Sequence, residues 1–284
     1  MESNMIFNKP VTEIIKKRIS VRSYDSKSLD SSLRNSLEEC LRNLKGPFDS
    51  KVRYKLIDIK DFESKDIKLG TYGIIRGVSS FVAAVINNEG MSIEQLGYEL
   101  EQFVLYATSL GLGTCWLGGT FKKGEFAKAM ELKESEILPI VTPVGYPKEK
   151  EGLIGSLMRT VAGSKNRKAF EELFYSENFD KPLSESEAGV YKEALEMVRL
   201  APSASNKQPW RIVKDENNLH IYLKHTPGYS KGMGFDMQRV DIGIAVCHLD
   251  LTLREAGING SFKKVHPDIK ALDENTEYVI SWVK

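Results

Sequence analysis

Two stretches of the chain resemble each other, and this internal repeat constrains the fold more than any single motif. Residues 96–111 (LGYELEQFVLYATSLG) match residues 242–257 (IGIAVCHLDLTLREAG), with a glycine at the second and the last position of each. Both stretches are apolar along most of their length, which is typical of a buried helix. Both end in glycine, the residue that commonly follows the last turn of a helix. We therefore predict one long buried helix in each half of the chain.

Two weaker matches extend the repeat on either side. Residues 29–44 match residues 183–198, and residues 138–144 match residues 277–283. Each half then contains a helix, a loop, a strand, the long helix, a loop and a strand, in this order. The pattern predicts an α+β fold. Two unrelated α+β units are the alternative interpretation.

A repeat of this kind is typical of a fused dimer. In a symmetric homodimer one surface patch meets its own copy, and two fused copies keep that interface while their sequences diverge. We expect two tandem, pseudo-equivalent half-domains, residues 1–175 and 176–284, that mimic a homodimer and pack as one unit. The halves differ where residues 43–49 of the first half stand in place of a turn of the second half that begins at Pro202, and where residues 257–262 stand in place of residues 111–119.

This turn (APSASNKQPW, residues 201–210) is rich in hydrogen-bonding groups. Pro202 disfavours a helical conformation at the residue before it and ends the preceding apolar helix. Ser203, Ser205, Asn206 and Gln208 then offer donors and acceptors to a ligand with many hydroxyl groups. A well-made loop without a ligand has the same composition.

A short segment near the N-terminus places two arginines close together. In an extended RISVR segment, Arg18, Ser20 and Arg22 share one face, and Ile19 and Val21 are buried on the other. Two guanidinium groups and a hydroxyl suit a phosphate monoester. A basic surface strand is the alternative. The preceding residues predict a short helix capped by Thr12.

A second basic segment, residues 164–168 (SKNRK), precedes a short helical run over residues 169–174. Ser164 is a candidate helix cap, and the free amides of a helix start attract anions. Lys165 and Arg167 add positive charge there. A solvated run of charges explains the same residues.

Residues 114–120 (TCWLGGT) follow the first long helix. Gly118 and Gly119 lack side chains, so their amides can approach a flat ring closely. The nearby Gly111-Leu-Gly113 follows a helix rather than a strand and lacks a third glycine, so it is not a dinucleotide-binding motif.

Composition excludes several classes of protein. The chain has 284 residues, is 41% hydrophobic and 28% charged, and has a net charge of +1, so no nucleic-acid or membrane partner is expected. The apolar stretch 77–86 is too short to span a bilayer, and no signal peptide is evident, so we expect a cytoplasmic protein. Three separated cysteines predict reduced thiols, with Cys40 and Cys247 in the core. The histidines show no metal-ligand spacing.

Together these segments resemble the nitroreductase superfamily, specifically its TM nitroreductase branch, in which one chain holds two half-domains. The resemblance covers the chain from about residue 14 to its end. It implies one FMN per chain, between the halves, with no metal and no assigned catalytic side chain. The cofactor-binding residues that it implies are Arg18, Ser20, Arg22, Arg76, Trp116, Leu117, Gly118, Gly119, Lys165, Arg167, Pro202, Ser203, Ala204, Ser205, Asn206 and Gln208.

The resemblance implies an FMN-dependent oxidoreductase. NADH or NADPH is the expected donor, and nitroaromatics, quinones or similar small molecules are the expected acceptors, in a ping-pong cycle with hydride transfer through the flavin N5. Residues 228–235 and 121–130 are expected to shape the substrate pocket. A non-catalytic flavin-binding or redox-sensing protein, a flavoenzyme that dehydrogenates or dehalogenates its substrate, and a ligand-free structural domain are the alternatives. We expect a monomeric pseudo-dimer, with further association left open.

Overall fold

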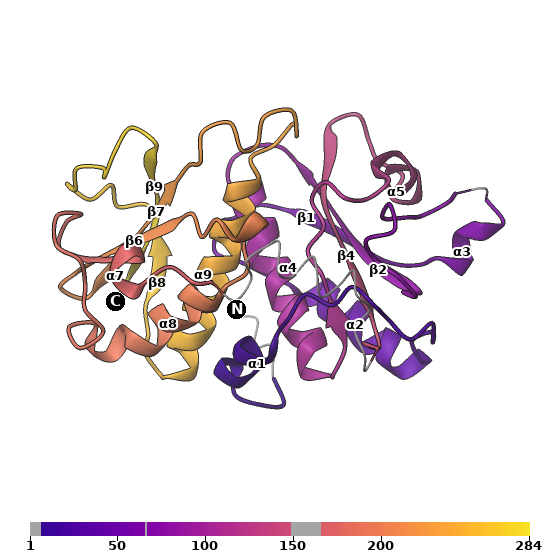
Figure 1. Ribbon diagram of the computed structural model, residues 1–284, viewed down its shortest axis with the longest axis horizontal. Helices are drawn as coiled ribbons and strands as arrows, with labels where there is room; N and C mark the ends of the chain where they lie inside the picture. The colour runs from indigo at the N-terminus through magenta and orange to yellow at the C-terminus, as the bar shows by residue number, and fades with distance from the viewer. Residues whose placement is uncertain (1–6, 66, 149–165) are drawn as a thin grey trace.

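Two β-sheets lie on either side of a pair of long helices in the computed structural model, which describes residues 7–65, 67–148 and 166–284 (Figure 1). The first sheet has the strand order β1-β2-β4-β3, and the second has the order β5-β6-β7-β9-β8. The strands of the first sheet are β1 (Val52–Asp58), β2 (Ser80–Asn87), β3 (Gly113–Thr114) and β4 (Glu136–Gly145). Those of the second are β5 (Phe174–Ser176), β6 (Trp210–Asp215), β7 (Asn218–Lys224), β8 (Ser261–Lys263) and β9 (Thr276–Val283).

The two sheets share one topology. The order β1-β2-β4-β3 is repeated by β6-β7-β9-β8, and β5 adds a parallel strand beside β6. A register shift interrupts the β2–β4 ladder, and another interrupts the β7–β9 ladder at the corresponding pair of strands. The α+β architecture of two pseudo-equivalent halves is therefore confirmed.

The sequence pattern missed strands in both halves, including β3, β5 and β8. It predicted a single strand before each long helix, whereas β1 and β2 precede the first long helix and β6 and β7 precede the second. β1 alternates basic and apolar residues and is only half-buried along most of its length, so it lacks a continuous apolar run. The match between residues 138–144 and 277–283 is correct, because these residues form β4 and β9.

The two long helices, α4 (Ser92–Ser109) and α9 (Met237–Glu255), cross at equivalent glycines. A Cβ atom on Gly97 would lie 2.2 Å from the Val240 carbonyl oxygen, and one on Gly243 would lie 2.1 Å from the Glu94 carbonyl oxygen. Only glycine allows the two backbones to come this close. The crossing therefore joins the halves as an interface between two copies would.

Both long helices end as the sequence predicts. Gly111 has a φ of +80° and Gly257 a φ of +68°. These left-handed conformations follow the last helical turn, where glycine avoids the steric penalty of a Cβ atom.

The first sheet is covered on both faces. Val82, Ala84 and Ile86 of β2 belong to the main core with α4 and α2 (Ser31–Asn43). The alternate residues of β2 form a second core with α3 (Lys60–Glu63) and α5 (Lys123–Ala129). This alternation follows from the two-residue period of a strand.

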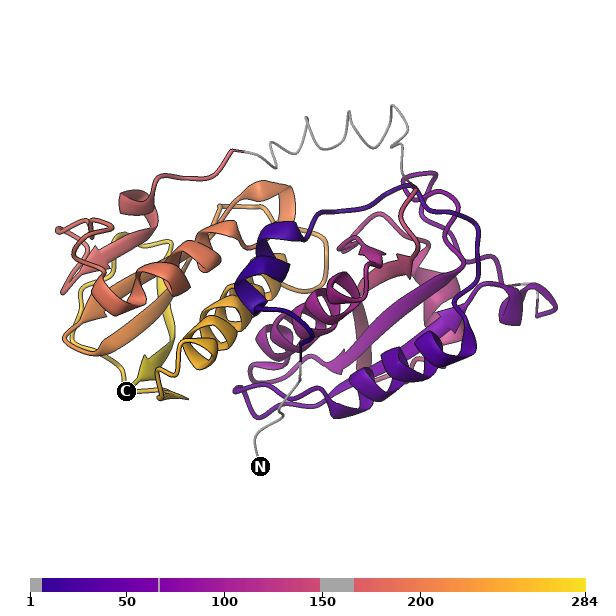
Figure 2. The same ribbon diagram turned by 90° about the horizontal axis from the view of Figure 1, so that it is seen from below.

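The N-terminal helix α1 (Val11–Lys17) lies between the two halves (Figure 2). The prediction that Thr12 caps it is wrong. Pro10 is the N-cap residue, and the carboxylate of Glu255, at the end of α9, accepts hydrogen bonds from the amides of Val11 and Thr12. A carboxylate from the other half therefore satisfies the free amides of this helix.

Elements α7 (Phe170–Leu173), η1 (Gly189–Tyr191), α8 (Lys192–Leu200) and η2 (Ala204–Asn206) precede β6. The helix expected from residue 169 has four residues, and Ala169 is its N-cap. Ser164, the expected cap, lies outside the described residues. Because Ala169 caps this helix, the prediction that Ser164 caps it is wrong. The expected boundary between residues 175 and 176 falls within β5.

Candidate functional site

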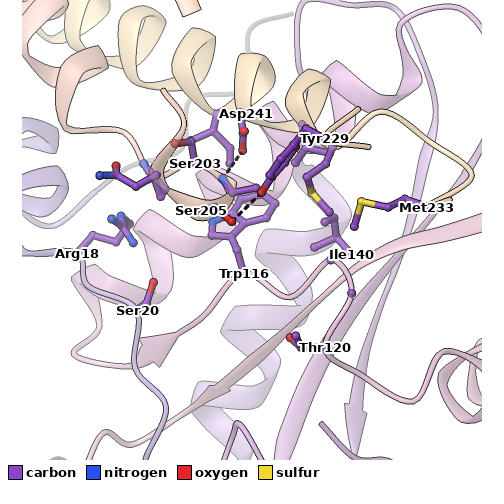
Figure 3. Close-up of a pocket in the computed structure, with 18 of the residues that line it drawn as sticks. Arg18, Ser20, Trp116, Thr120, Ile140, Ser203, Ser205, Tyr229, Met233 and Asp241 are labelled. Atoms are coloured by element: carbon purple, nitrogen blue, oxygen red, sulfur yellow. Dashed lines mark hydrogen bonds between the residues drawn. The ribbon is translucent and has the colours of Figure 1, made fainter. Parts of the chain in front are cut away.

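A cavity of about 700 Å³ lies between the two halves (Figure 3). Its first wall comes from the segment after α1 and from the residues after β3, and its second wall comes from the turn before β6 and from α9. The cavity brings together twelve of the residues singled out in the sequence: Arg18, Ser20, Arg22, Trp116, Gly118, Gly119, Arg167, Pro202, Ser203, Ala204, Ser205 and Asn206.

Three other candidate residues do not line it, and a fourth is not described. Leu117 is buried and pairs with Val141 through both of its backbone groups. The Arg76 side chain is exposed, and its backbone amide donates to the Arg22 carbonyl at 3.0 Å. Gln208 is 3% exposed and supports the turn from behind. Lys165 lies outside the described residues.

The segment after α1 differs from the extended strand that was expected. Ile19 is 54% exposed and lines the cavity, whereas Val21 is buried as expected. The segment is not part of a regular ladder, because Ser20 forms an isolated bridge with Thr114. A strict alternation of faces requires regular strand geometry, so the predicted burial of Ile19 was wrong.

Three guanidinium groups reach one end of the cavity. The Arg18 side chain is 8% exposed, and its Nε atom lies 3.7 Å from Oε1 of Glu101 without a hydrogen-bond partner among the described residues. Arg167 donates to the Asn206 side-chain oxygen and, at 3.0 Å, to the Leu200 carbonyl. Arg22 makes one long contact of 3.4 Å with the Ser20 carbonyl.

Burial and repulsion from neighbouring charges act on Arg167. Burial, the largest cause, and the nearby charges of Arg18 and Arg199 together lower the pKa of Arg167 to about 10. Clustered, partly desolvated cations without enough acceptors favour an anionic ligand. The end of the cavity around these arginines is named the cationic end below.

The turn before β6 holds an unusual backbone. Ser205, Asn206 and Gln208 have φ values of 48°, 53° and 49°, in the left-handed region that favours glycine. A conformation of this kind persists when its surroundings fix it and is frequent at functional sites. The turn therefore presents its residues to the cavity in a shape that the sequence alone does not favour.

Hydrogen bonds from three directions fix this turn. The Gln208 amide donates to Oγ of Ser203 at 2.9 Å, and the Asn206 side-chain amide donates to the Asn166 carbonyl at 2.6 Å. The Ala204 amide donates to Oδ1 of Asp241 on α9 at 2.9 Å. The side chain of Gln208 accepts from the Lys168 amide at 2.9 Å and donates to the Asn206 carbonyl at 3.2 Å, so it serves the turn rather than the cavity.

The first half carries an equivalent arrangement, in which side chains lie against the loop. Gln95 of α4 accepts a hydrogen bond from the Phe48 amide at 2.9 Å, as Asp241 of α9 does from the Ala204 amide. At this place a Cβ atom on Gly46 would lie 2.8 Å from the ring of Tyr98, so side chains fill the space. The two halves therefore have related loops, and of these two loops the one in the second half lines the cavity.

The other end of the cavity is mainly apolar. Ile140, Val240 and Ile244 line it, together with Met233 and Met237. A Cβ atom on Gly118 would lie 1.9 Å from the Met237 methyl group, and one on Gly119 would lie 3.5 Å from that of Met233. The Met237 side chain of the second half thus packs directly over Gly118 of the first, a contact between the halves that only the structure reveals.

Residues 228–235 shape the cavity as predicted, because Tyr229 and Met233 lie on its wall (Figure 3). The Tyr229 hydroxyl donates to Oγ of Ser205 at 2.9 Å and ties this loop to the turn. Residues 121–130 were expected to contribute and do not. Phe121, Phe126 and Met130 are buried in the second core, behind the first sheet.

Asp241 is a cavity residue that sequence reasoning missed. It is 2% exposed, burial raises its pKa well above the ordinary carboxyl range, and its Oδ2 atom has no hydrogen-bond partner among the described residues. The available signal was one acidic residue within the stripe Met237, Val240, Asp241 and Ile244, whose spacing places all four on one helix face.

Two further properties concern the described residues as a whole. No helix among them is long and apolar enough to cross a membrane. No cluster of histidine, cysteine, aspartate and glutamate among them is arranged to hold a metal ion.

All three cysteines are free and buried, so the expected core positions of Cys40 and Cys247 are confirmed.

Comparison with one solved structure supports the fold. The chain is similar to a nitroreductase from Thermotoga maritima, with 21% identity and a TM-score of 0.62 over 99% of this chain and 96% of the other. A nitroreductase with bound FMN from Bacteroides fragilis has 19% identity and a TM-score of 0.41, over 51% of this chain and 92% of its own. An FMN-dependent nitroreductase from Clostridium difficile has 15% identity and a TM-score of 0.40, over 49% of this chain and 88% of its own.

A search of curated protein sequences found no match. A family model described as "Putative TM nitroreductase" matches residues 10–253, which include the cationic end, the turn and most of α9. The chain therefore belongs to this nitroreductase family.

Proposed function

We propose that the protein is an FMN-dependent oxidoreductase that uses NADH or NADPH to reduce nitroaromatics, quinones or similar small acceptors. One observation carries the proposal. Arginines from two distant parts of the chain meet at one end of a cavity whose opposite wall is a turn rich in hydroxyl and amide groups. Membership of a nitroreductase family and the FMN named for two structural neighbours support it.

The residues present fit FMN by their chemistry. The phosphate group carries close to two negative charges, and Arg18, Arg22 and Arg167 supply cations, with an unpartnered Nε on Arg18. Ser203, Ser205 and Asn206 offer hydroxyl and amide groups to the ribityl chain. The apolar end, next to Gly118 and Gly119, suits a flat ring system.

FMN, when bound, supplies the electron chemistry, and the protein binds and orients it. In this proposal the three arginines hold the phosphate group, and Trp116 and Ile140 exclude water from the cavity wall. Asp241 keeps its proton because it is buried, so it adds no negative charge beside the anionic ligand. One chain contains both walls, so we propose one FMN per chain and a monomer as the functional unit.

A second function is favoured by one contact. The methyl group of Met237 lies against Gly118, at the end of the cavity that suits the ring. A site closed in this way would serve a non-catalytic flavin-binding or redox-sensing protein, because a nicotinamide donor needs access to the ring.

The visible spectrum of the purified protein, with and without added FMN, tests the proposal. Anaerobic NADH or NADPH should then bleach a flavin band of about one equivalent per chain. A band that resists both donors would favour the second function. A protein that binds no FMN at all would contradict both.

A further inference from the structure

A buried pair of titratable side chains lies behind the cationic end. Glu101 of α4 and His248 of α9 are each 0% exposed, and Oε1 of Glu101 lies 2.9 Å from Nε2 of His248. The Nδ1 atom of His248 lies 2.8 Å from the Met197 carbonyl oxygen. The pair thus joins the two halves at a point where neither residue meets solvent.

The partners of the pair determine where its protons are. A carbonyl oxygen only accepts, so Nδ1 of His248 carries a proton. Two cavity residues contact Glu101. Trp116 donates from its indole Nε1 to Oε2 at 3.0 Å, and the Nε atom of the Arg18 guanidinium lies 3.7 Å from Oε1. Both contacts favour an ionised carboxylate. Because Nδ1 already donates, the 2.9 Å contact between Nε2 and Oε1 contains one further proton, and the pair as a whole carries no net charge.

This assignment changes the charge that the cationic end presents. Glu101 alone would cancel the charge of Arg18, whereas Glu101 and His248 together are neutral and leave the charge of Arg18 uncompensated. The Nε atom of Arg18 has no hydrogen-bond partner among the described residues, so electrostatic attraction governs its relation to Glu101.

We propose that His248 is a positioning residue for the phosphate of the ligand: it neutralises Glu101, so that Arg18 remains available to bind the anion and Trp116 is held on the cavity wall. The inference rests on the proposed flavin site. It concerns FMN more than riboflavin, because riboflavin has the same ring and ribityl chain but no phosphate.

The affinities of the apoprotein for FMN and for riboflavin, measured by quenching of flavin fluorescence, test this role. His248→Gln should weaken FMN binding about tenfold or more, the scale of one contact to a charged group, and leave riboflavin binding unchanged. Glu101→Gln should leave both affinities unchanged, because the carboxylate that His248 neutralises is then absent and the glutamine side chain still offers an acceptor to Trp116. The double variant Glu101→Gln/His248→Gln should regain the preference for FMN, because the unpaired carboxylate is gone.

His220→Gln is the matched control. His220 is a second buried histidine, 2% exposed, with Nδ1 at 2.6 Å from Oγ of Ser281 in the second sheet, and its replacement should not alter the FMN-to-riboflavin ratio. The inference is overturned if His248→Gln binds FMN like the wild type, or if both flavins weaken equally. Should His248→Gln fail to fold, a double variant with a reduced preference for FMN overturns it, and one with the wild-type preference supports it. A wild-type protein that binds neither flavin instead contradicts the proposed function.

Discussion

The crossing of α4 and α9 offers a sharp test of how the two halves are joined. A methyl group at residue 243 would lie 2.1 Å from the Glu94 carbonyl oxygen, 2.7 Å from the Tyr98 amide nitrogen and 2.9 Å from the Gly97 Cα atom. All three are backbone atoms, so no side-chain rotation relieves the clash. Gly243→Ala therefore forces the two helices apart by about 1 Å to restore ordinary contact distances.

The cost of Gly243→Ala can be bounded. Overpacking a well-packed core costs about 1–3 kcal/mol. Alanine favours a helix interior over glycine by about 0.5–1 kcal/mol, which offsets part of that loss. Because the clash involves rigid backbone on both sides, we expect a net loss near the upper part of the range, about 2 kcal/mol or more. Residues 241 and 244 line the cavity, so FMN affinity should fall as well.

Chemical denaturation followed by circular dichroism and by tryptophan fluorescence measures this loss. Gly124→Ala is the control, because Gly124 lies in α5 and a Cβ atom there meets nothing within 4 Å. The same substitution should there be neutral or stabilising by up to about 1 kcal/mol. A Gly243→Ala variant as stable as the wild type would refute the close crossing.

Three further predictions concern the cavity and the buried carboxyls. Arg22→Ala and Asn206→Ala, on different halves, should each weaken FMN binding in a fluorescence titration. The loss for Arg22→Ala should be about 1.5–3 kcal/mol, as for a contact to a charged group. Arg76→Ala, at an exposed arginine outside the cavity, is the control and should bind FMN like the wild type; wild-type affinity in all three variants would exclude a site between the halves. Burial raises the pKa of Glu99 from 4.5 to about 7, so the unfolded chain releases this proton at lower pH than the folded chain, and stability falls by about 3 kcal/mol as pH rises from about 4.5 to 7. Glu99→Gln should remove that fall in denaturant titrations across this range; an unchanged pH profile would contradict it. Burial raises the pKa of Asp241 in the same direction, so Asp241→Asn should raise the thermal midpoint at pH 7, by an amount that shrinks to zero near pH 3, whereas a gap that persists at pH 3 would indicate a loss of packing instead.

Local sequence patterns predicted the elements whose structure depends only on residues within one segment. The apolar periodicity and terminal glycines identified α4 and α9, because a helix that is buried along its whole length needs no information from elsewhere in the chain. The same reasoning failed for β1 and for Ile19. The position of a half-buried strand depends on the strands beside it. In a segment outside a β-ladder, successive side chains need not alternate between a buried and an exposed face.

The sequence by itself determined the repeat, the two long helices, the arginines after α1 and the polar turn that begins at Pro202, because each of these is written in consecutive residues. Tertiary structure alone decided that the turn of the second half faces the arginines of the first, and that Met237, Asp241 and the Glu101–His248 pair lie at or behind the cavity. These contacts join residues that are far apart in the chain. They depend on the angle and closeness of a helix crossing, which packing of both halves sets at once.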